Sequence, residues 1–147
     1  MPVNKNFQKR ITILDECFSG RTGLYTLEKL IEIVAETKID GVIASNTSVN
    51  REGLKASKEQ LEIIGNGGLS GNPIEAKSVQ VIKFLAKLTD YRFPIIGVGG
   101  ISSVDTAIRK LDAGASLLQI YSSLIYQGPF FPASLNKSLS HRSKFWI

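Results

Sequence analysis

The chain has 147 residues, 43% of them hydrophobic and 21% charged, a composition that fits one globular domain and excludes a disordered chain. No apolar run approaches the roughly 20 residues that a membrane helix needs, and we expect no signal peptide at the N-terminus. The net charge of +5 comes from the two ends, because 12 basic and 13 acidic residues lie between positions 11 and 135. A basic face along the body is therefore not expected, and neither is nucleic-acid binding.

A single cysteine, Cys17, and a single histidine, His141, restrict the chemistry that is available. One cysteine cannot form an internal disulfide, which is typical of proteins in a reducing cytoplasm. One histidine and one cysteine are also too few for a usual transition-metal site. We therefore expect a cytoplasmic chain without a metal, in which Cys17 is a buried or bystander thiol and His141 is a solvated tail residue.

The predicted elements alternate between helix and strand. Residues 11–14 are compatible with a short strand, and residues 24–35 show the apolar spacing of an amphipathic helix. Residues 41–44 form a short apolar strand that leads into hydroxyl and amide side chains. The polar segment 49–72 has no sustained period, and a loop of this length inside a domain is usually functional. Pro73 is well placed as the first residue of the next helix, which ends before Asp90.

The clearest functional pattern is the stretch 94–103, which begins as an apolar strand and then carries Gly97, Gly99 and Gly100 within four residues. Glycines allow a backbone to approach a ligand closely, and the N–H groups of a following helix suit an anion such as phosphate. Ser102 with Asp105 matches a helix-capping pattern there. The glycines could instead serve tight packing between strand and helix, and the residues alone leave both interpretations open.

A second strand over residues 116–122 follows that helix, and its final hydroxyl groups could reach the same anion. Pro132 is expected to begin a last helix. Strands that alternate with helices indicate parallel pairing through right-handed crossovers, in a doubly wound sheet or in part of an eight-stranded barrel. Barrel phosphate sites commonly follow strands seven and eight. We therefore predict an α/β fold, a partial TIM-type β/α barrel with about strands 6 to 8.

Five motifs stand in a fixed order: SNTSVNREGL at 45–54, GGLSGNP at 67–73, PIIGVGGISS at 94–103, AGASLLQIY at 113–121 and LIYQGP at 124–129. In order and spacing, over about residues 24–138, they resemble dihydroorotate dehydrogenase. The Asn-Arg-Glu-Gly-Leu and Ile-Tyr-Gln-Gly-Pro pieces resemble its class 2, quinone-using branch.

The resemblance implies an FMN-bearing barrel that oxidises dihydroorotate to orotate in pyrimidine biosynthesis and passes electrons to a quinone. It implies substrate hydrogen bonds from Asn46 and Thr47, whose side chains offer the paired donors and acceptors that a pyrimidine needs. It implies FMN contacts at seven positions: the flavin at Ser45, Ser70 and Gly71, and the phosphate at Gly99, Gly100, Tyr121 and Ser122.

The resemblance also implies that part of the family's site is missing. The serine base, the substrate asparagines and the first flavin loop belong to the family's N-terminal half, so no catalytic base is expected in this chain. Residues 11–18 occupy about the place of the fifth strand without the family's Lys-Ile-Ala-Pro pattern. We therefore divide the chain into a divergent segment over 1–22, the C-terminal half of an FMN-binding barrel over 23–139, and a tail over 140–147.

Several alternatives remain from the residues alone. Asn46 and Thr47 could cap a helix, and Ser70 with Gly71 could form an ordinary turn. The chain could be a non-catalytic fragment that folds only by self-association or with a partner half, because an open barrel leaves strand edges unpaired. It could also belong to another phosphate-binding barrel without a flavin. The resemblance to the class 2 branch implies a second location, since a full-length class 2 protein would be peripheral on the inner membrane rather than cytoplasmic.

Overall fold

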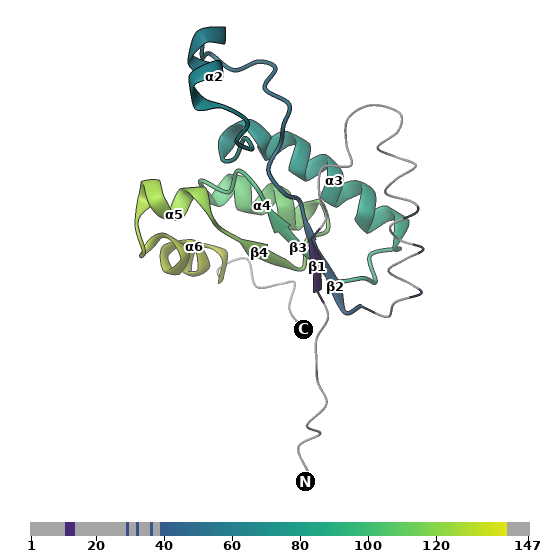
Figure 1. The fold of residues 1–147 in the computed structure, drawn as a ribbon. Helices are drawn as coiled ribbons and strands as arrows, with labels where there is room; N and C mark the ends of the chain where they lie inside the picture. The colour runs from purple at the N-terminus through teal and green to yellow at the C-terminus, as the bar shows by residue number, and fades with distance from the viewer. Residues whose placement is uncertain (1–10, 14–28, 30–31, 33–35, 37–38, 141–147) are drawn as a thin grey trace, which may run out of the picture.

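The structure, a computed structural model, describes residues 11–13, 29, 32, 36 and 39–140 (Figure 1). Residues 29, 32 and 36 are helical, and the rest of the helix predicted over 24–35, together with Cys17 and His141, lies outside the described residues. Four parallel strands form one sheet: β1 (Ile11–Ile13), β2 (Gly41–Ala44), β3 (Ile95–Val98) and β4 (Leu117–Gln119). The helices that follow along the chain are α2 (Lys58–Ile64), the 3-10 helix η1 (Asn72–Ile74), α3 (Glu75–Leu88), α4 (Val104–Asp112), α5 (Ser122–Gln127) and α6 (Phe131–Ser140).

The strands lie in the sheet in the same order as in the sequence, β1-β2-β3-β4. Ala44 pairs with Gly97 and Val98 pairs with Gln119, so the carboxyl ends of β2, β3 and β4 lie at one edge. A doubly wound sheet reverses its strand order at a switch point, whereas a β/α barrel adds strands in sequence. The predicted partial barrel is therefore confirmed, and the short strand over residues 11–13 is its first described member.

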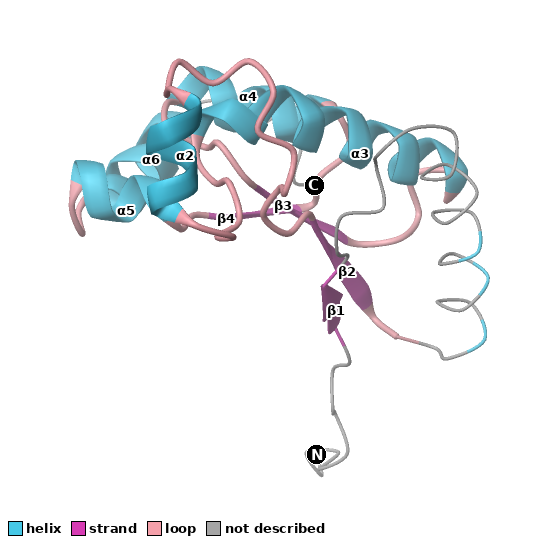
Figure 2. Cartoon of the chain, turned by 45° about the horizontal axis from the view of Figure 1, so that its top comes forward, coloured by secondary structure: helices cyan, strands magenta, loops and turns pink. Residues whose placement is uncertain are grey.

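The core lies between the sheet and α3, which is drawn along the same side of the strands as α4 (Figure 2). The helical spacing expected from the sequence brings Ile82, Leu85 and Ala86 inward, and each is at most 1% exposed. A Cβ at Gly97 would lie 3.0 Å from the Ile82 Cδ1 atom. Gly97 therefore serves close packing between strand and helix.

The opposite face of the sheet is less covered. Ile43, Ile96 and Leu117 are in register across β2, β3 and β4, and all three side chains are accessible, Leu117 to 60%. Side chains of alternate strand residues that face away from the helices fill the interior of a closed β/α barrel. This row is therefore part of a barrel interior, contributed by β2, β3 and β4.

Some predicted elements differ from those in the structure, and α6, for example, begins at Phe131 rather than at Pro132. The segment 49–72 contains α2, which escaped prediction because it has seven residues and none of them is buried. Pro73 lies in η1, and α3 begins at Glu75. The second strand ends at Gln119, because the chain turns and Ser122 is already the first residue of α5.

Candidate functional site

A cavity of about 350 Å³ lies at the carboxyl ends of β2, β3 and β4. Parallel strands present the loops that follow them at one edge, so segments far apart in sequence meet there. All the site residues expected from the sequence line this one cavity: Ser45, Asn46, Thr47, Ser70, Gly71, Gly99, Gly100, Tyr121 and Ser122. The structure thus brings the nine residues together; their roles remain predictions.

The first part of the site follows β2 directly. Ser45 is half-buried, and Asn46 and Thr47 are exposed; all three line the cavity. The Thr47 N–H donates to Asn46 Oδ1 over 2.8 Å. No described helix begins near this pair, because the next one, α2, has Ser57 as its N-cap. The alternative that Asn46 and Thr47 cap a helix is therefore wrong.

Two backbone hydrogen bonds hold the loop after β2 against the loop before η1. Ser48 N–H donates to the Leu69 carbonyl over 2.9 Å, and Leu69 N–H donates back over 2.6 Å. Arg51 organises the intervening chain, because its guanidinium donates to the carbonyls of Leu61, Gly65 and Gly67. A planar group with five donors can bond several carbonyls at once. The loop that carries Ser70 is therefore internally braced.

Replacing Arg51 with alanine should open this loop without unfolding the core. Three backbone carbonyls would lose their donor, so we expect amide hydrogen exchange over residues 61–69 to accelerate about tenfold, which corresponds to roughly 1.4 kcal/mol of local stability. Arg92→Ala is the matched control, because Arg92 pairs with Asp90 at an exposed site. Equal exchange in both variants would show that Arg51 does not brace the loop.

Ser70 and Gly71 connect this loop to the start of α5. The Ser122 hydroxyl donates to Ser70 Oγ over 2.9 Å, across 52 positions of sequence. Gly71 has φ +77°, a conformation that favours glycine, and it begins the turn into η1. The interpretation of these residues as a turn is therefore correct as local structure, and the same turn places Ser70 beside Ser122.

Gly99 and Gly100 form a tight turn between β3 and α4, with φ of +95° and +73°. A Cβ at Gly99 would lie 2.9 Å from Ile74 Cδ1, and one at Gly100 would lie 2.7 Å from the Cα of Glu75. Both glycines therefore allow close packing of the turn against η1 and α3, as the packing interpretation predicts. Both residues also line the cavity, so the close packing leaves the anion interpretation open.

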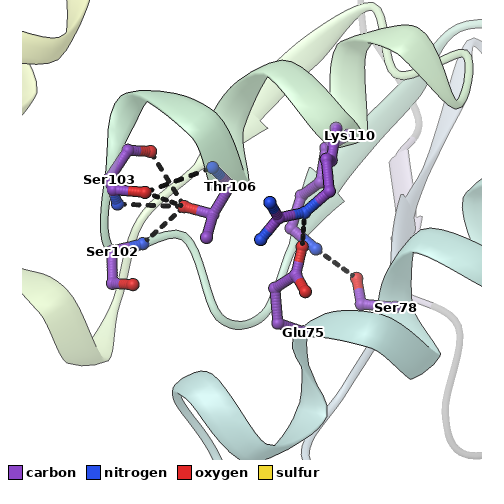
Figure 3. Close-up of polar contacts among 7 residues, drawn as sticks. Glu75, Ser78, Ser102, Ser103, Thr106 and Lys110 are labelled. Atoms are coloured by element: carbon purple, nitrogen blue, oxygen red, sulfur yellow. Dashed lines mark hydrogen bonds and ion pairs between the residues drawn. The ribbon is translucent and has the colours of Figure 1, made fainter.

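The start of α4 uses its donors internally, as Figure 3 shows. Ser102 N–H and Ser103 N–H each donate to Thr106 Oγ1 over 2.9 Å, and Thr106 N–H donates to Ser103 Oγ. The predicted Ser102–Asp105 cap is therefore wrong by one residue, because Ser103 is the N-cap. The N–H groups of Ser102 and Ser103 are therefore already satisfied within the start of α4.

Helix α5 docks onto the glycine turn through two side chains. Ser123 Oγ donates to the Ile101 carbonyl, and Gln127 Nε2 donates to the Ser102 carbonyl over 2.7 Å. These contacts fix Tyr121 and Ser122 beside Gly99 and Gly100. Backbone at the ends of two neighbouring strands therefore forms one side of the cavity.

Part of the lining was not predicted from the sequence. The additional residues are mostly apolar or uncharged side chains at strand ends and turns: Ile43, Ile74, Val98, Ile101, Gln119, Ile120 and Ser123. Alternation along β3 and β4 from Val98 and Gln119 could have identified the positions that face away from α3. The lining therefore combines an apolar wall with hydroxyl, amide and glycine groups.

Among the described residues that line the cavity, none carries a carboxylate, ammonium, guanidinium or imidazole group. Across the part of the chain that the structure describes, no cluster of three or more His, Cys, Asp or Glu side chains could hold a metal ion. No helix among those residues is long and apolar enough to cross a membrane. The cavity can bind an uncharged ring and, through hydroxyl and backbone groups, an anion.

Comparison with known proteins identifies the family. The family model for dihydroorotate dehydrogenase matches residues 23–142. A dihydroorotate dehydrogenase (quinone) from Christiangramia forsetii is 51% identical over 113 residues, 77% of this chain and 32% of the relative. The protein of the same name from Chloroflexus aurantiacus is 43% identical over 118 residues, 80% and 32% of the two chains. The chain thus spans about a third of the length of these curated relatives.

Solved structures agree with this assignment. A dihydroorotate dehydrogenase from Eimeria tenella in complex with ferulenol is similar with a TM-score of 0.70 and 31% identity, over 79% of this chain and 30% of that one. A ligand-free form from the same organism matches with a TM-score of 0.74 at 24% identity, over 92% and 37%, which supports the fold. The chain belongs to the dihydroorotate dehydrogenase family.

Proposed function

We propose that this chain forms the FMN-phosphate side and part of the orotate site of a quinone-dependent dihydroorotate dehydrogenase. That enzyme oxidises dihydroorotate to orotate in pyrimidine biosynthesis and passes the electrons through FMN to a quinone. One observation carries the proposal: nine residues from separate segments, selected by family resemblance, line a single cavity.

The phosphate subsite in this proposal lies where two strands end. Gly99 and Gly100 after β3 and Tyr121 and Ser122 after β4 provide backbone and hydroxyl groups with no cationic side chain in the lining. Positive φ at both glycines lets the backbone face a ligand closely. A dianionic phosphate fits such a set of oriented neutral donors.

The ring subsite is the remainder of the cavity. Ile43, Ile74 and Val98 form an apolar wall, and Ser45 and Ser70 lie at its polar side. This combination suits a flat heteroaromatic ring with polar edges. When bound there, FMN supplies the two-electron oxidant, while the chain's residues hold and orient it.

Asn46 and Thr47 are proposed to bind the pyrimidine. An amide and a hydroxyl can both donate and accept, and orotate presents alternating carbonyl and N–H groups. Neither side chain can remove a proton at neutral pH. The base must therefore come from outside the cavity lining, in the part of the relatives that this chain does not span.

Replacing Ser122 with alanine tests the phosphate subsite. Loss of one hydrogen bond to a charged group should weaken FMN binding about tenfold, whereas riboflavin, which lacks the phosphate, should bind equally to both proteins. Flavin fluorescence titration measures both affinities. Ser138→Ala is the matched control, because that hydroxyl donates to the Ser134 carbonyl within α6. If wild-type protein does not distinguish FMN from riboflavin, the proposed subsite is wrong.

A second candidate function is a non-catalytic piece that pairs with itself or with a separate barrel half. The accessible row Ile43, Ile96 and Leu117 favours it, as do the sheet's two edge strands, β1 and β4. Light scattering should then give a dimer, and dihydroorotate turnover should need an added N-terminal part of the Christiangramia forsetii relative. A monomer that turns over dihydroorotate alone would exclude this candidate. Either function is compatible with a cytoplasmic or peripheral membrane location.

A further inference from the structure

Lys110 is a fully buried lysine behind the glycine turn. It lies on α4, its relative exposure is 0%, and its Nζ donates to Ser78 Oγ on α3 over 2.9 Å (Figure 3). Its Cδ atom lies 3.4 Å from the place a Cβ would take at Gly97, so the aliphatic stem packs on β3. Lysine side chains are almost never fully buried unless they are paired.

The contact continues to the end of β3. Ser78, which is 1% exposed, donates its hydroxyl proton to the Val98 carbonyl. Val98 is the last residue of β3, and Gly99 and Gly100 follow it directly. An ammonium, a hydroxyl and a carbonyl thus form one continuous chain from α4 to the turn. In such a chain each group has a fixed orientation, and the successive hydrogen bonds strengthen one another.

The charges around Lys110 come from the two helices that enclose it. The carboxylate of Glu75 on α3 favours the charged form of Lys110, whereas the guanidinium of Arg109 disfavours it. Glu75 Oε1 also accepts a hydrogen bond from Arg109 Nε over 3.0 Å. Strands β3 and β4 carry no titratable side chain, and Lys137 on α6 is exposed. Burial is the dominant effect and lowers the pKa of Lys110 to about 8.

We propose that Lys110 is a positioning residue of the anion subsite: through Ser78 it fixes the Val98 carbonyl and the Gly99–Gly100 turn, and its buried charge favours a phosphate bound there. The identity of the anion as the FMN phosphate rests on the proposed function. The ammonium is shielded from water, so its field at the turn is weakly screened. In a cavity lined by uncharged residues, this lysine supplies the positive charge that the lining lacks.

The proposal predicts a pH dependence with a definite sign. Lys110 is charged below its pKa and neutral above it, so affinity for a phosphate should fall as pH rises through about 8. Between pH 7 and pH 9 the charged fraction drops about tenfold, which sets the largest expected loss of FMN affinity at about tenfold. Riboflavin affinity should not follow this change.

The variants Lys110→Met and Ser78→Ala separate charge from packing. Methionine keeps an unbranched apolar stem and removes the desolvation cost of a buried ammonium, so this variant should fold and should unfold at no lower denaturant concentration. We expect it to bind FMN about tenfold more weakly than wild type at pH 7, with no change up to pH 9. Ser78→Ala should weaken FMN binding but keep the pH dependence, because Lys110 remains.

Fluorescence titrations of FMN and riboflavin at pH 7, 8 and 9 give the test. A wild-type affinity for FMN that is independent of pH, or a pH dependence that persists in Lys110→Met, would overturn the inference. If neither flavin binds, the proposed function fails, and the Lys110 pKa is then followed by NMR with and without inorganic phosphate. A phosphate-induced rise in that pKa supports the anion subsite, and an unchanged value contradicts it.

Discussion

Replacing Gly100 with alanine should lower the free energy of unfolding by about 3 kcal/mol and abolish detectable FMN binding. The new Cβ would overlap the Cβ of Glu75 and lie 2.7 Å from its Cα, and φ at this position is +73°. The left-handed conformation alone costs an alanine about 1–2 kcal/mol, and a clash with helix backbone adds the cost of shifting α3. Urea denaturation and flavin fluorescence measure the two effects.

Gly53→Ala is the matched control for that prediction. Gly53 has φ +77°, nearly the same backbone conformation, but nothing lies within 4 Å of its Cβ position. We expect a loss of only about 1 kcal/mol and unchanged FMN affinity. If both variants are destabilised equally, the close contact between α3 and the turn is not the reason that position 100 needs a glycine.

Gly68→Ala should lower orotate affinity by more than tenfold in the FMN-loaded protein while the core stays folded. A Cβ there would overlap Thr47 Oγ1 and lie 2.6 Å from Thr47 Cβ, so rotation of the threonine cannot relieve the clash. The loop must then move away, which breaks the Ser48–Leu69 pairing and displaces Thr47 and Ser70. Isothermal titration with orotate measures the loss.

The neighbouring glycine provides the control for this loop. Gly67 has no atom within 4 Å of its Cβ position, and its φ lies outside the left-handed region. Gly67→Ala should therefore leave orotate affinity within about twofold of wild type. If the two variants behave alike, the contact between Thr47 and Gly68 does not shape the substrate subsite.

Much of the fold could be predicted because its signals are local. The apolar runs at 41–44 and 95–98 and the stripe through Ile82, Leu85 and Ala86 specify strands and a helix by periodicity alone. The phosphate signal after the last two predicted strands then favoured a barrel, and the nine expected residues meet because parallel strands end at one edge.

What could not be predicted depends on tertiary contacts. The carbonyls that Arg51 bonds lie 10 to 16 positions away, and no periodic pattern encodes that distance. The burial of Lys110 could not be predicted because lysine normally marks a solvated helix face. The cap at Ser103 differs from the expected one by a single residue, since Thr106 rather than Asp105 completes it.

The proposed site is tested most directly by backbone amide chemical shifts of the ¹⁵N-labelled chain, titrated separately with FMN and riboflavin. The cavity geometry predicts that FMN shifts Gly99, Gly100, Tyr121 and Ser122 most, that riboflavin leaves these four nearly unchanged, and that both ligands shift Ser45 and Ser70. Largest shifts on the exposed helix α2, or equal shifts of the four residues by both ligands, would contradict a phosphate subsite at the ends of β3 and β4.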